Sequence, residues 1–238
     1  MNFGIIAAGQ GSRLVQEGVA LPKPLVTIDG QPMIGRLIDI FTRCGAESIS
    51  VIVNEEMREV AEYLTENAPK LPCAFNLVVK TTPTSMHSFY ELSKIMEGKG
   101  RYIITTVDTI FREEDFSKYV AAFENAGADV DGVMAVTGFI DDEKPLYVAT
   151  DAEGRITGFL DAWREGVKYV SGGIYGLGQS AIPVLKRCLD AGVGRMRNYQ
   201  RALVEAGLNL RAYDMNKIID VDHAADIVTA ETFINDNH

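Results

Sequence analysis

Residues 3–26 read FGIIAAGQGSRLVQEGVALPKPLV, and this stretch determines how we interpret the rest of the chain. Its first six residues, 3–8, form a short apolar run of the kind found in buried strands. The run ends at Gly9-Gln10-Gly11-Ser12-Arg13, a loop of small residues that contains one guanidinium. Glycines let backbone N–H groups approach an anion closely, and Arg13 and Lys23 add two positive charges. The combination predicts a strand that ends in a polyphosphate-binding loop.

Two other phosphate-binding motifs fit this stretch less well. A dinucleotide-binding fold requires G-x-G-x-x-G at the start of a helix. Leu14 stands at the third glycine position, and Gly18, Pro22 and Pro24 leave too little uninterrupted chain for that helix. The P-loop pattern G-x-x-x-x-G-K-[ST] does not occur in this stretch either. An NAD-dependent oxidoreductase is therefore disfavoured.

The composition is that of an ordinary globular protein. With 238 residues, 47% hydrophobic and 24% charged, the chain is long enough for a large α/β domain with a sizeable core. Its 33 acidic and 23 basic residues give a net charge of −10, so we expect no nucleic-acid partner. Three widely spaced cysteines predict neither a disulfide framework nor a zinc site. No leader pattern or long apolar stretch is evident, so we expect no membrane association and a cytoplasmic location.

Strand and helix patterns alternate through the first half of the chain. Short apolar runs predict strands at 3–8, 48–53, 75–79 and 101–107. Helical spacing of apolar residues predicts helices at 32–45, 55–64 and 89–96. This rhythm is typical of a parallel sheet covered by helices on both faces.

The rhythm changes after residue 137. The runs 147–150 and 155–159 are separated by Asp151-Ala152-Glu153-Gly154, which predicts a β-hairpin. Because hairpin strands are antiparallel, we expect residues 137–170 to form a small antiparallel lid or platform within a single domain, 1–238. After it the chain returns to the main sheet at 171–175. Further helices are predicted at 180–191, 198–205 and 223–234, with a strand at 208–213.

Two pieces of the opening stretch, A-A-G-x-G-S-R-L at 7–14 and L-P-K-P-L-V at 21–26, resemble the signature of the sugar-phosphate nucleotidyltransferases, the nucleoside-diphosphate-sugar pyrophosphorylase family. The resemblance continues in order through Val107-Asp108, S-G-G-I-Y at 171–175 and I-D-V-D at 219–222, and so covers nearly the whole chain. It implies a Rossmann-like three-layer α/β sandwich of the glycosyltransferase-A type. In that fold a mainly parallel central sheet has a small antiparallel β insertion that binds the acceptor.

The resemblance also implies a Mg²⁺-dependent enzyme that transfers a nucleoside monophosphate from a nucleoside triphosphate to a phosphorylated acceptor and releases pyrophosphate. Arg13 and Lys23 are its expected catalytic residues, on the departing pyrophosphate and the α-phosphate respectively. The expected metal carboxylates are Asp108, at a strand end, and Asp222, with Asp220 as the fallback. The expected nucleotide-binding residues are Ala7, Ala8, Gly9, Gly11, Ser12, Thr82 and Ser85.

The acceptor is less sharply defined. Gly172 and Gly173 match the segment that lines the sugar pocket in the resembled family. Asp161 stands where many members have the Glu of an E-K pair that contacts the sugar, but here the pair is Asp161-Ala162. We expect Asp161, Gly172 and Gly173 to bind the acceptor, with a sugar 1-phosphate as the first candidate.

Several alternatives stay open. The loop TTPTSMHS at 81–88 resembles family versions that receive a pyrimidine, so a cytidylyltransferase acting on phosphocholine or another small alcohol phosphate is the second candidate. Molybdopterin cofactor assembly is a weaker third. From a different class, the chain could be a non-catalytic nucleotide-binding regulatory domain, although binding alone does not require both Asp108 and Asp222. Because members of the family often self-associate, a homo-oligomer is a further expectation.

Overall fold

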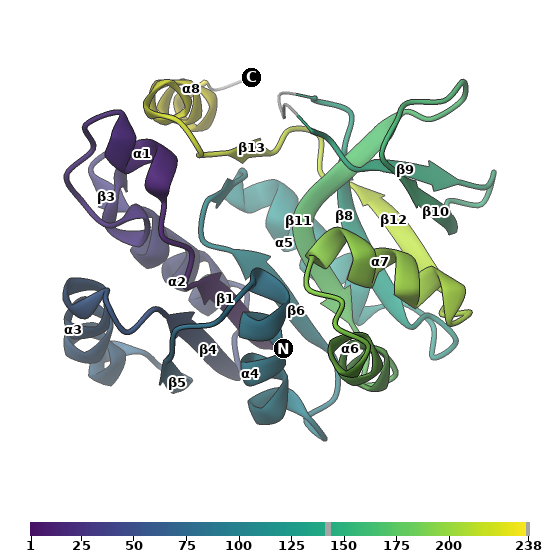
Figure 1. Ribbon diagram of the computed structural model, residues 1–238, viewed down its shortest axis with the longest axis horizontal. Coiled ribbons are helices and arrows are strands. Elements are labelled where there is room, and N and C mark those ends of the chain that lie inside the picture. Colours follow the sequence, from purple (N-terminus) through teal and green to yellow (C-terminus); the bar gives the residue numbers. More distant parts are fainter. Residues whose placement is uncertain (141–143, 237–238) are drawn as a thin grey trace.

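The computed structural model describes residues 1–140 and 144–236 and contains one large mixed sheet (Figure 1). The main strand order is β10-β9-β11-β6-β1-β4-β5; β8 pairs with β11, and β12 pairs with β8. Four neighbouring strands are parallel, as the sequence predicts: β1 (Asn2–Ala7), β4 (Ser48–Val53), β5 (Ala74–Val79) and β6 (Tyr102–Thr106). These four strands form the parallel half of the sheet.

The other half of the sheet is organised around one long antiparallel strand, β11 (Tyr169–Leu177). The end of β11 pairs with β6, while its first two residues pair with β9 (Tyr147–Thr150). The remaining strands of this half are β8 (Gly132–Thr137), β10 (Ile156–Leu160) and β12 (Leu210–Asp214), of which β12 pairs parallel with β8. The predicted hairpin is therefore present as β9 and β10, but it extends the main sheet instead of forming a separate lid. The reason is that β11 offers β9 a free edge at its beginning.

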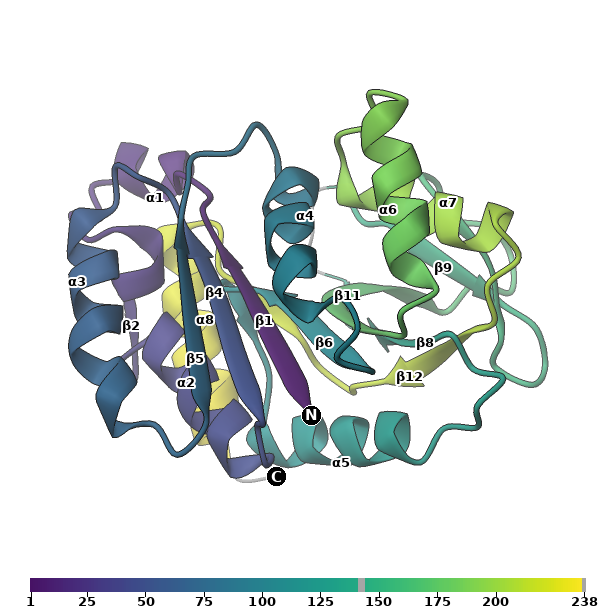
Figure 2. The ribbon, with the colours of Figure 1, turned by 90° about the horizontal axis from the view of Figure 1, so that it is seen from below.

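Helices cover both faces of the sheet, as Figure 2 shows for α5 on one side and for α4 and α6 on the other. One hydrophobic core contains apolar residues of the helices α2 (Met33–Arg43), α3 (Arg58–Asn67), α5 (Glu113–Glu124) and α8 (Ala224–Asn235), together with Leu14 of the short helix α1. The second core contains residues of α4 (Ser85–Met96), α6 (Ala181–Asp190) and α7 (Met196–Glu205). The expected three-layer, Rossmann-like α/β architecture is confirmed.

The apolar opening run of the sequence serves both cores. All six residues of β1 are buried. Phe3, Ile5 and Ala7 contribute to the first core, and Ile6 contributes to the second. Successive side chains of a strand point to opposite faces of a sheet, so a central strand that is covered on both sides needs a continuous apolar run.

Short elements connect the main strands and helices, and one of them, β13, returns the last part of the chain to the carboxyl ends of the parallel strands. They are α1 (Ser12–Gln16), β2 (Thr27–Ile28), β3 (Gln31–Pro32), β7 (Thr109–Ile110), β13 (Ile219–Asp220) and the 3-10 helices η1 (Lys23–Leu25) and η2 (Ala68–Lys70). β13 pairs antiparallel with β7, so that Asp220 lies opposite Thr109. This pairing places residues 219–222 beside Asp108.

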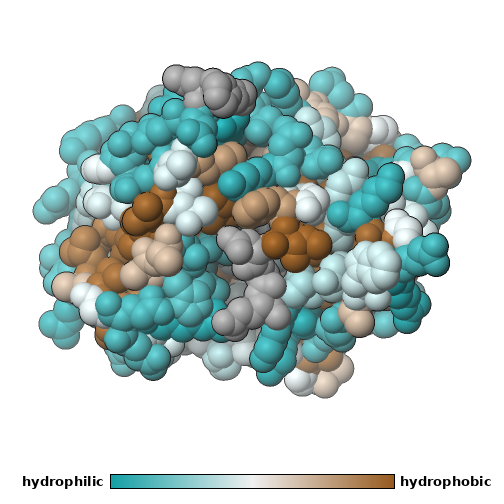
Figure 3. Space-filling view, turned by 90° about the horizontal axis from the view of Figure 1, so that it is seen from above, coloured by the Kyte–Doolittle hydropathy of each residue, from teal (hydrophilic) through white to brown (hydrophobic). Residues whose placement is uncertain are grey.

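The surface is mixed in character. Figure 3 shows mostly hydrophilic residues from above, with apolar ones interspersed. The large exposed apolar side chains come from separate elements, for example Val15 of α1 and Val228 of α8. Among the described residues, no helix is long and apolar enough to span a lipid bilayer.

Candidate active site

The glycine loop follows β1 and turns sharply at Gly11. Gly11 is the N-cap of α1 and has a φ of 61°, in the left-handed region that glycine adopts without strain. A Cβ added to Gly11 would lie 2.8 Å from the Cβ of Lys23. Glycine at this position therefore allows both the turn and the close approach of Lys23. The helix that follows has only five residues, consistent with the short uninterrupted stretch in the sequence.

Lys23 connects the two predicted metal carboxylates. Its ammonium Nζ lies 2.5 Å from Oδ2 of Asp108 and 2.7 Å from Oδ1 of Asp222. The second oxygen of Asp222, Oδ2, lies 3.1 Å from Nη1 of Arg13. Four residues that span more than two hundred positions of the chain thus meet in one chain of ion pairs, which we call the charge cluster: Arg13, Lys23, Asp108 and Asp222.

A backbone hydrogen bond links the two segments that contain Asp108 and Asp222. Asp108 follows directly after the parallel strand β6 and Val107. The amide N–H of Val221 donates to the carbonyl oxygen of Asp108 at 3.0 Å, which links the segment before Asp222 to the end of that strand. Asp108 therefore lies at the carboxyl edge of the parallel half, where ligands bind in open α/β sheets.

The cluster also sets the protonation of its members. Burial lowers the pKa of Lys23, but the charges and hydrogen bonds of Asp108 and Asp222 outweigh it, so the net pKa is raised. Burial raises the pKa of Asp222, yet the hydrogen bond and charge of Lys23, with the charge of Arg13, outweigh it and lower the net pKa. Lys23 is therefore a cation and Asp222 an anion at neutral pH.

A cavity of about 660 Å³ opens beside the charge cluster, large enough for a nucleotide. Its lining includes all four residues of the cluster and nearly all of the predicted nucleotide-binding residues: Ala8, Gly9, Gly11, Ser12, Thr82 and Ser85. We call it the donor cavity. Ala7 is the exception, because its side chain is buried in the core beneath the loop.

A second cavity, of about 310 Å³, lies on the other side of the carboxylates, and we call it the acceptor cavity. It shares five lining residues with the donor cavity: Thr84, Ser85, Thr106, Asp108 and Asp222. A third, smaller cavity of about 110 Å³ lies beside the start of α8 and is also lined by Asp222. Asp222 therefore lines all three of these cavities. Asp220 lines the acceptor cavity and the small cavity but not the donor cavity.

The three residues predicted to bind the acceptor do not line one common cavity. Gly173 lines the acceptor cavity and Gly172 the small one. Gly173 has a φ of 71°, and the pairing of β11 with β8 is irregular between Ser171 and Tyr175, so the strand bends here. Asp161 lines none of these three cavities. Its carboxylate instead lies 2.6 Å from Arg201 and 3.1 Å from Arg197, two arginines of α7.

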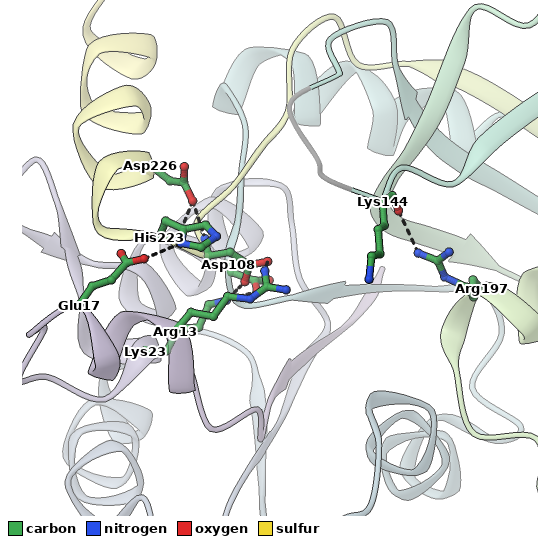
Figure 4. A network of polar contacts seen from close by, with 9 residues as sticks. Arg13, Glu17, Lys23, Asp108, Lys144, Arg197, His223 and Asp226 are labelled. Carbon is green, nitrogen blue, oxygen red and sulfur yellow. Dashed lines mark hydrogen bonds and ion pairs between the residues drawn. The ribbon is translucent and has the colours of Figure 1, made fainter. Parts of the chain in front are cut away.

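Several residues of the two cavities were not foreseen from the sequence. Asn54 lines the donor cavity, and its Oδ1 accepts a hydrogen bond at 3.0 Å from the hydroxyl of Thr81, a residue of the loop 81–88 singled out in the sequence. Arg195 and Arg197 line the acceptor cavity at the start of α7. In Figure 4, Lys144 and Arg197 lie across from Arg13 and Lys23. Two arginines that flank Met196, Arg195 and Arg197, are a sequence signal for an anion site, but nothing in the local sequence indicates that they face Asp108.

The donor set fits Mg²⁺. Asp108 and Asp222 converge on one point, as shown by the single ammonium that contacts both. Within residues 1–140 and 144–236 there is no group of three or more His, Cys, Asp or Glu that could enclose a metal by itself. Mg²⁺ is usually held by one or two carboxylates together with substrate phosphates, so two carboxylates at the junction of two cavities suit this ion.

Comparison with known proteins identifies the family. The family model described as "Nucleotidyl transferase" matches residues 4–236, and the chain belongs to this family. The family resemblance seen in the sequence is confirmed.

The individual curated relatives share less than a third of their aligned residues with this chain. A 2-aminoethylphosphonate cytidylyltransferase of Lancefieldella rimae is 31% identical over 113 residues, which are 48% of this chain and 45% of that protein. The bifunctional protein GlmU of Methanococcus maripaludis is 24% identical over 242 residues, which are 99% of this chain and 55% of that protein. The matches thus span about half the length of these curated relatives.

Solved structures show the same fold. A putative glucose-1-phosphate thymidylyltransferase from Bacillus anthracis superimposes with a TM-score of 0.83 at 21% identity, covering 100% of this chain and 96% of that one. The inositol-1-phosphate CTP transferase from T. maritima gives a TM-score of 0.78 at 16% identity, covering 99% and 96%.

Proposed function

We propose that the protein transfers CMP from CTP to a small acceptor that has a phosphate or phosphonate group, with release of pyrophosphate. The observation that carries the proposal is the position of Asp108 and Asp222, which line both the donor and the acceptor cavity and contact the same ammonium. A reaction between two anionic substrates requires them to meet beside positive charge, and this junction is where they would meet.

The choice of CTP and of a small acceptor has its own support. The relative with 31% identity and one of the structural neighbours are named as cytidylyltransferases or CTP transferases. The lysine of the family's E-K pair is replaced by Ala162, and Asp161, which lines none of the three cavities, is paired with Arg197 and Arg201. Both observations weaken the case for an acceptor site that is specific for a sugar.

In this reaction an acceptor oxygen attacks the α-phosphorus, a new P–O bond forms, and the bond to the β-phosphate breaks. Lys23 would stabilise the charge that develops on the α-phosphate, and Arg13 would bind the departing pyrophosphate. Mg²⁺ held by Asp108 and Asp222 would neutralise phosphate charge when bound. Arg195 would bind the acceptor's anionic group from the opposite side of the acceptor cavity.

A second candidate is transfer to a sugar 1-phosphate. It is favoured by the whole-chain match to GlmU and by the TM-score of 0.83 with the putative thymidylyltransferase. The fold is common to both candidates, so the acceptor that supports turnover has to distinguish them.

The test is pyrophosphate release in the presence of Mg²⁺. CTP, UTP, GTP, ATP and dTTP would each be paired with 2-aminoethylphosphonate, phosphocholine, glucose 1-phosphate, N-acetylglucosamine 1-phosphate and mannose 1-phosphate. We expect turnover with CTP and one of the first two acceptors, abolished in Asp108→Ala. Turnover only with a sugar 1-phosphate would establish the second candidate. Nucleotide binding without release from any pair would favour the regulatory alternative.

A further inference from the structure

Arg13 sits on an element that cannot hold it in place alone. Helix α1 has five residues, too few for an isolated helix to be stable in water, and the side chain of Arg13 is 53% exposed. Leu14 anchors the helix in the core, but it lies on one side only. The direction of the Arg13 guanidinium therefore depends on whatever fixes the far end of α1.

That end is fixed by Glu17. Glu17 is the C-cap residue of α1, and its carboxylate makes two short contacts with the beginning of α8. Oε2 accepts the backbone N–H of Ala224 at 2.6 Å, and Oε1 lies 2.6 Å from Nδ1 of His223 (Figure 4). The first N–H groups of a helix lack partners within it and favour a negative charge, so this carboxylate suits the start of α8.

The start of α8 in turn determines where Asp222 lies. Oδ2 of Asp226 accepts the backbone N–H of Asp222 at 2.9 Å and that of His223 at 2.6 Å. Asp222 is therefore held from behind by Asp226, while its own carboxylate faces Lys23 and Arg13. A closed ring results, running from Arg13 through α1 and Glu17 to the start of α8, and back through Asp222 to Arg13.

We propose that Glu17 is a positioning residue that sets Arg13 against Asp222 and thereby holds the pyrophosphate-binding side of the site in register with the metal carboxylates. The inference rests on the proposed function for the assignment of Arg13 to the departing pyrophosphate. The pKa of Glu17 is lowered by the N–H of Ala224 first and by His223 second, in agreement with a carboxylate that stays charged.

Binding of inorganic pyrophosphate tests the proposal directly, because this probe requires neither the base nor the acceptor to be known. Calorimetry with Mg²⁺ present would compare the wild type with Glu17→Ala, Glu17→Gln, Arg13→Ala and the double variant. We expect Glu17→Ala to weaken pyrophosphate binding about 10- to 100-fold, the usual effect of losing a residue that orients a functional group. Glu17→Gln keeps an oxygen that can accept one of the two contacts and should lose less.

The double variant separates positioning from a general structural role. If Glu17 acts through Arg13, adding Glu17→Ala to Arg13→Ala should change the dissociation constant by no more than about twofold. Equal weakening in both backgrounds, or an unchanged constant for Glu17→Ala, would overturn the proposal. Glu114→Ala is the matched control, because Glu114 also makes a 2.6 Å ion pair, with Lys118, but on α5. Thermal unfolding of every variant would show that the fold is intact.

Different results would contradict the proposed function and the role of Glu17. A wild type that binds pyrophosphate but releases none from any pair of substrates would contradict the proposed function and leave the role of Glu17 standing. A wild type that does not bind pyrophosphate would overturn the role given to Arg13 and Glu17 together.

Discussion

The donor and acceptor sides of the site are built in different ways. On the donor side, one glycine loop and one buried lysine sit at the end of a parallel strand, and their charges are already paired at 2.5 to 3.1 Å. On the acceptor side, a bent antiparallel strand and the start of α7 contribute most of the lining. The donor side is therefore centred on one compact motif, to which distant segments add further lining, whereas the acceptor side is assembled from distant segments alone. We infer that the first determines the reaction and the second the substrate.

The largest effect should come from Lys23→Ala, which removes the cation that connects Asp108 and Asp222. We expect kcat/KM to fall about 10²- to 10³-fold, as for the loss of one transition-state donor. Pyrophosphate release would measure the change, and Lys118→Ala, a surface residue of α5, would be the control. Near-normal turnover by folded Lys23→Ala would contradict the idea that the donor side determines the reaction.

Asp222→Asn and Asp220→Asn form the next comparison. Asp222 lines all three cavities and contacts Lys23, whereas Asp220 pairs with β7 and does not line the donor cavity. We expect a loss in kcat of about 10²-fold for Asp222→Asn, which removes a proposed metal ligand, and a clearly smaller loss for Asp220→Asn. Titration of activity with Mg²⁺ would show which variant needs more metal. The opposite order would make Asp220 the second metal carboxylate.

On the acceptor side, Arg195→Ala should raise the KM for the acceptor about tenfold and leave the KM for the nucleotide unchanged, because one charge-assisted contact is lost. Asp161→Ala is the companion variant. The Asp161 side chain is exposed and lines none of the three cavities, so its removal should alter neither constant by more than about twofold. If Asp161→Ala instead raised the KM for the acceptor as much as Arg195→Ala, we would again expect Asp161 to contact a sugar acceptor.

The smallest expected effect is on stability in acid. The folded-state pKa of Asp222 lies below the ordinary Asp value of 3.8, so its contribution to the free energy of unfolding is present above that value. This contribution should be lost as the pH falls below 3.8 and through the lowered pKa. Denaturant unfolding at a series of pH values would show a shallower loss for Asp222→Asn than for the wild type. An equal slope in both proteins would mean that the charge cluster does not stabilise the folded state.

The donor side was largely predictable because its chemistry lies in short segments. A strand, a glycine loop and a flanked lysine occur within 24 residues, and local backbone geometry is enough to turn them into an anion site. The alternation of apolar runs likewise predicted the parallel half and both helical layers. Asp108 was found because a strand ends there, at the edge where such sheets bind ligands.

Other features depended on which distant segments pack together. No local pattern shows that Asp222 instead of Asp220 meets Lys23, since that follows from the pairing of β13 with β7 and from the contacts of Asp226. Similarly, the hairpin joins the sheet because β11 is long enough to pair with β6 at one end and β9 at the other. The positions of Arg195 and Asp161 follow from the docking of α7. Local sequence thus accounts for the elements and for the chemistry of the donor loop, whereas the acceptor side depends on long-range packing, which residue spacing along the chain does not encode.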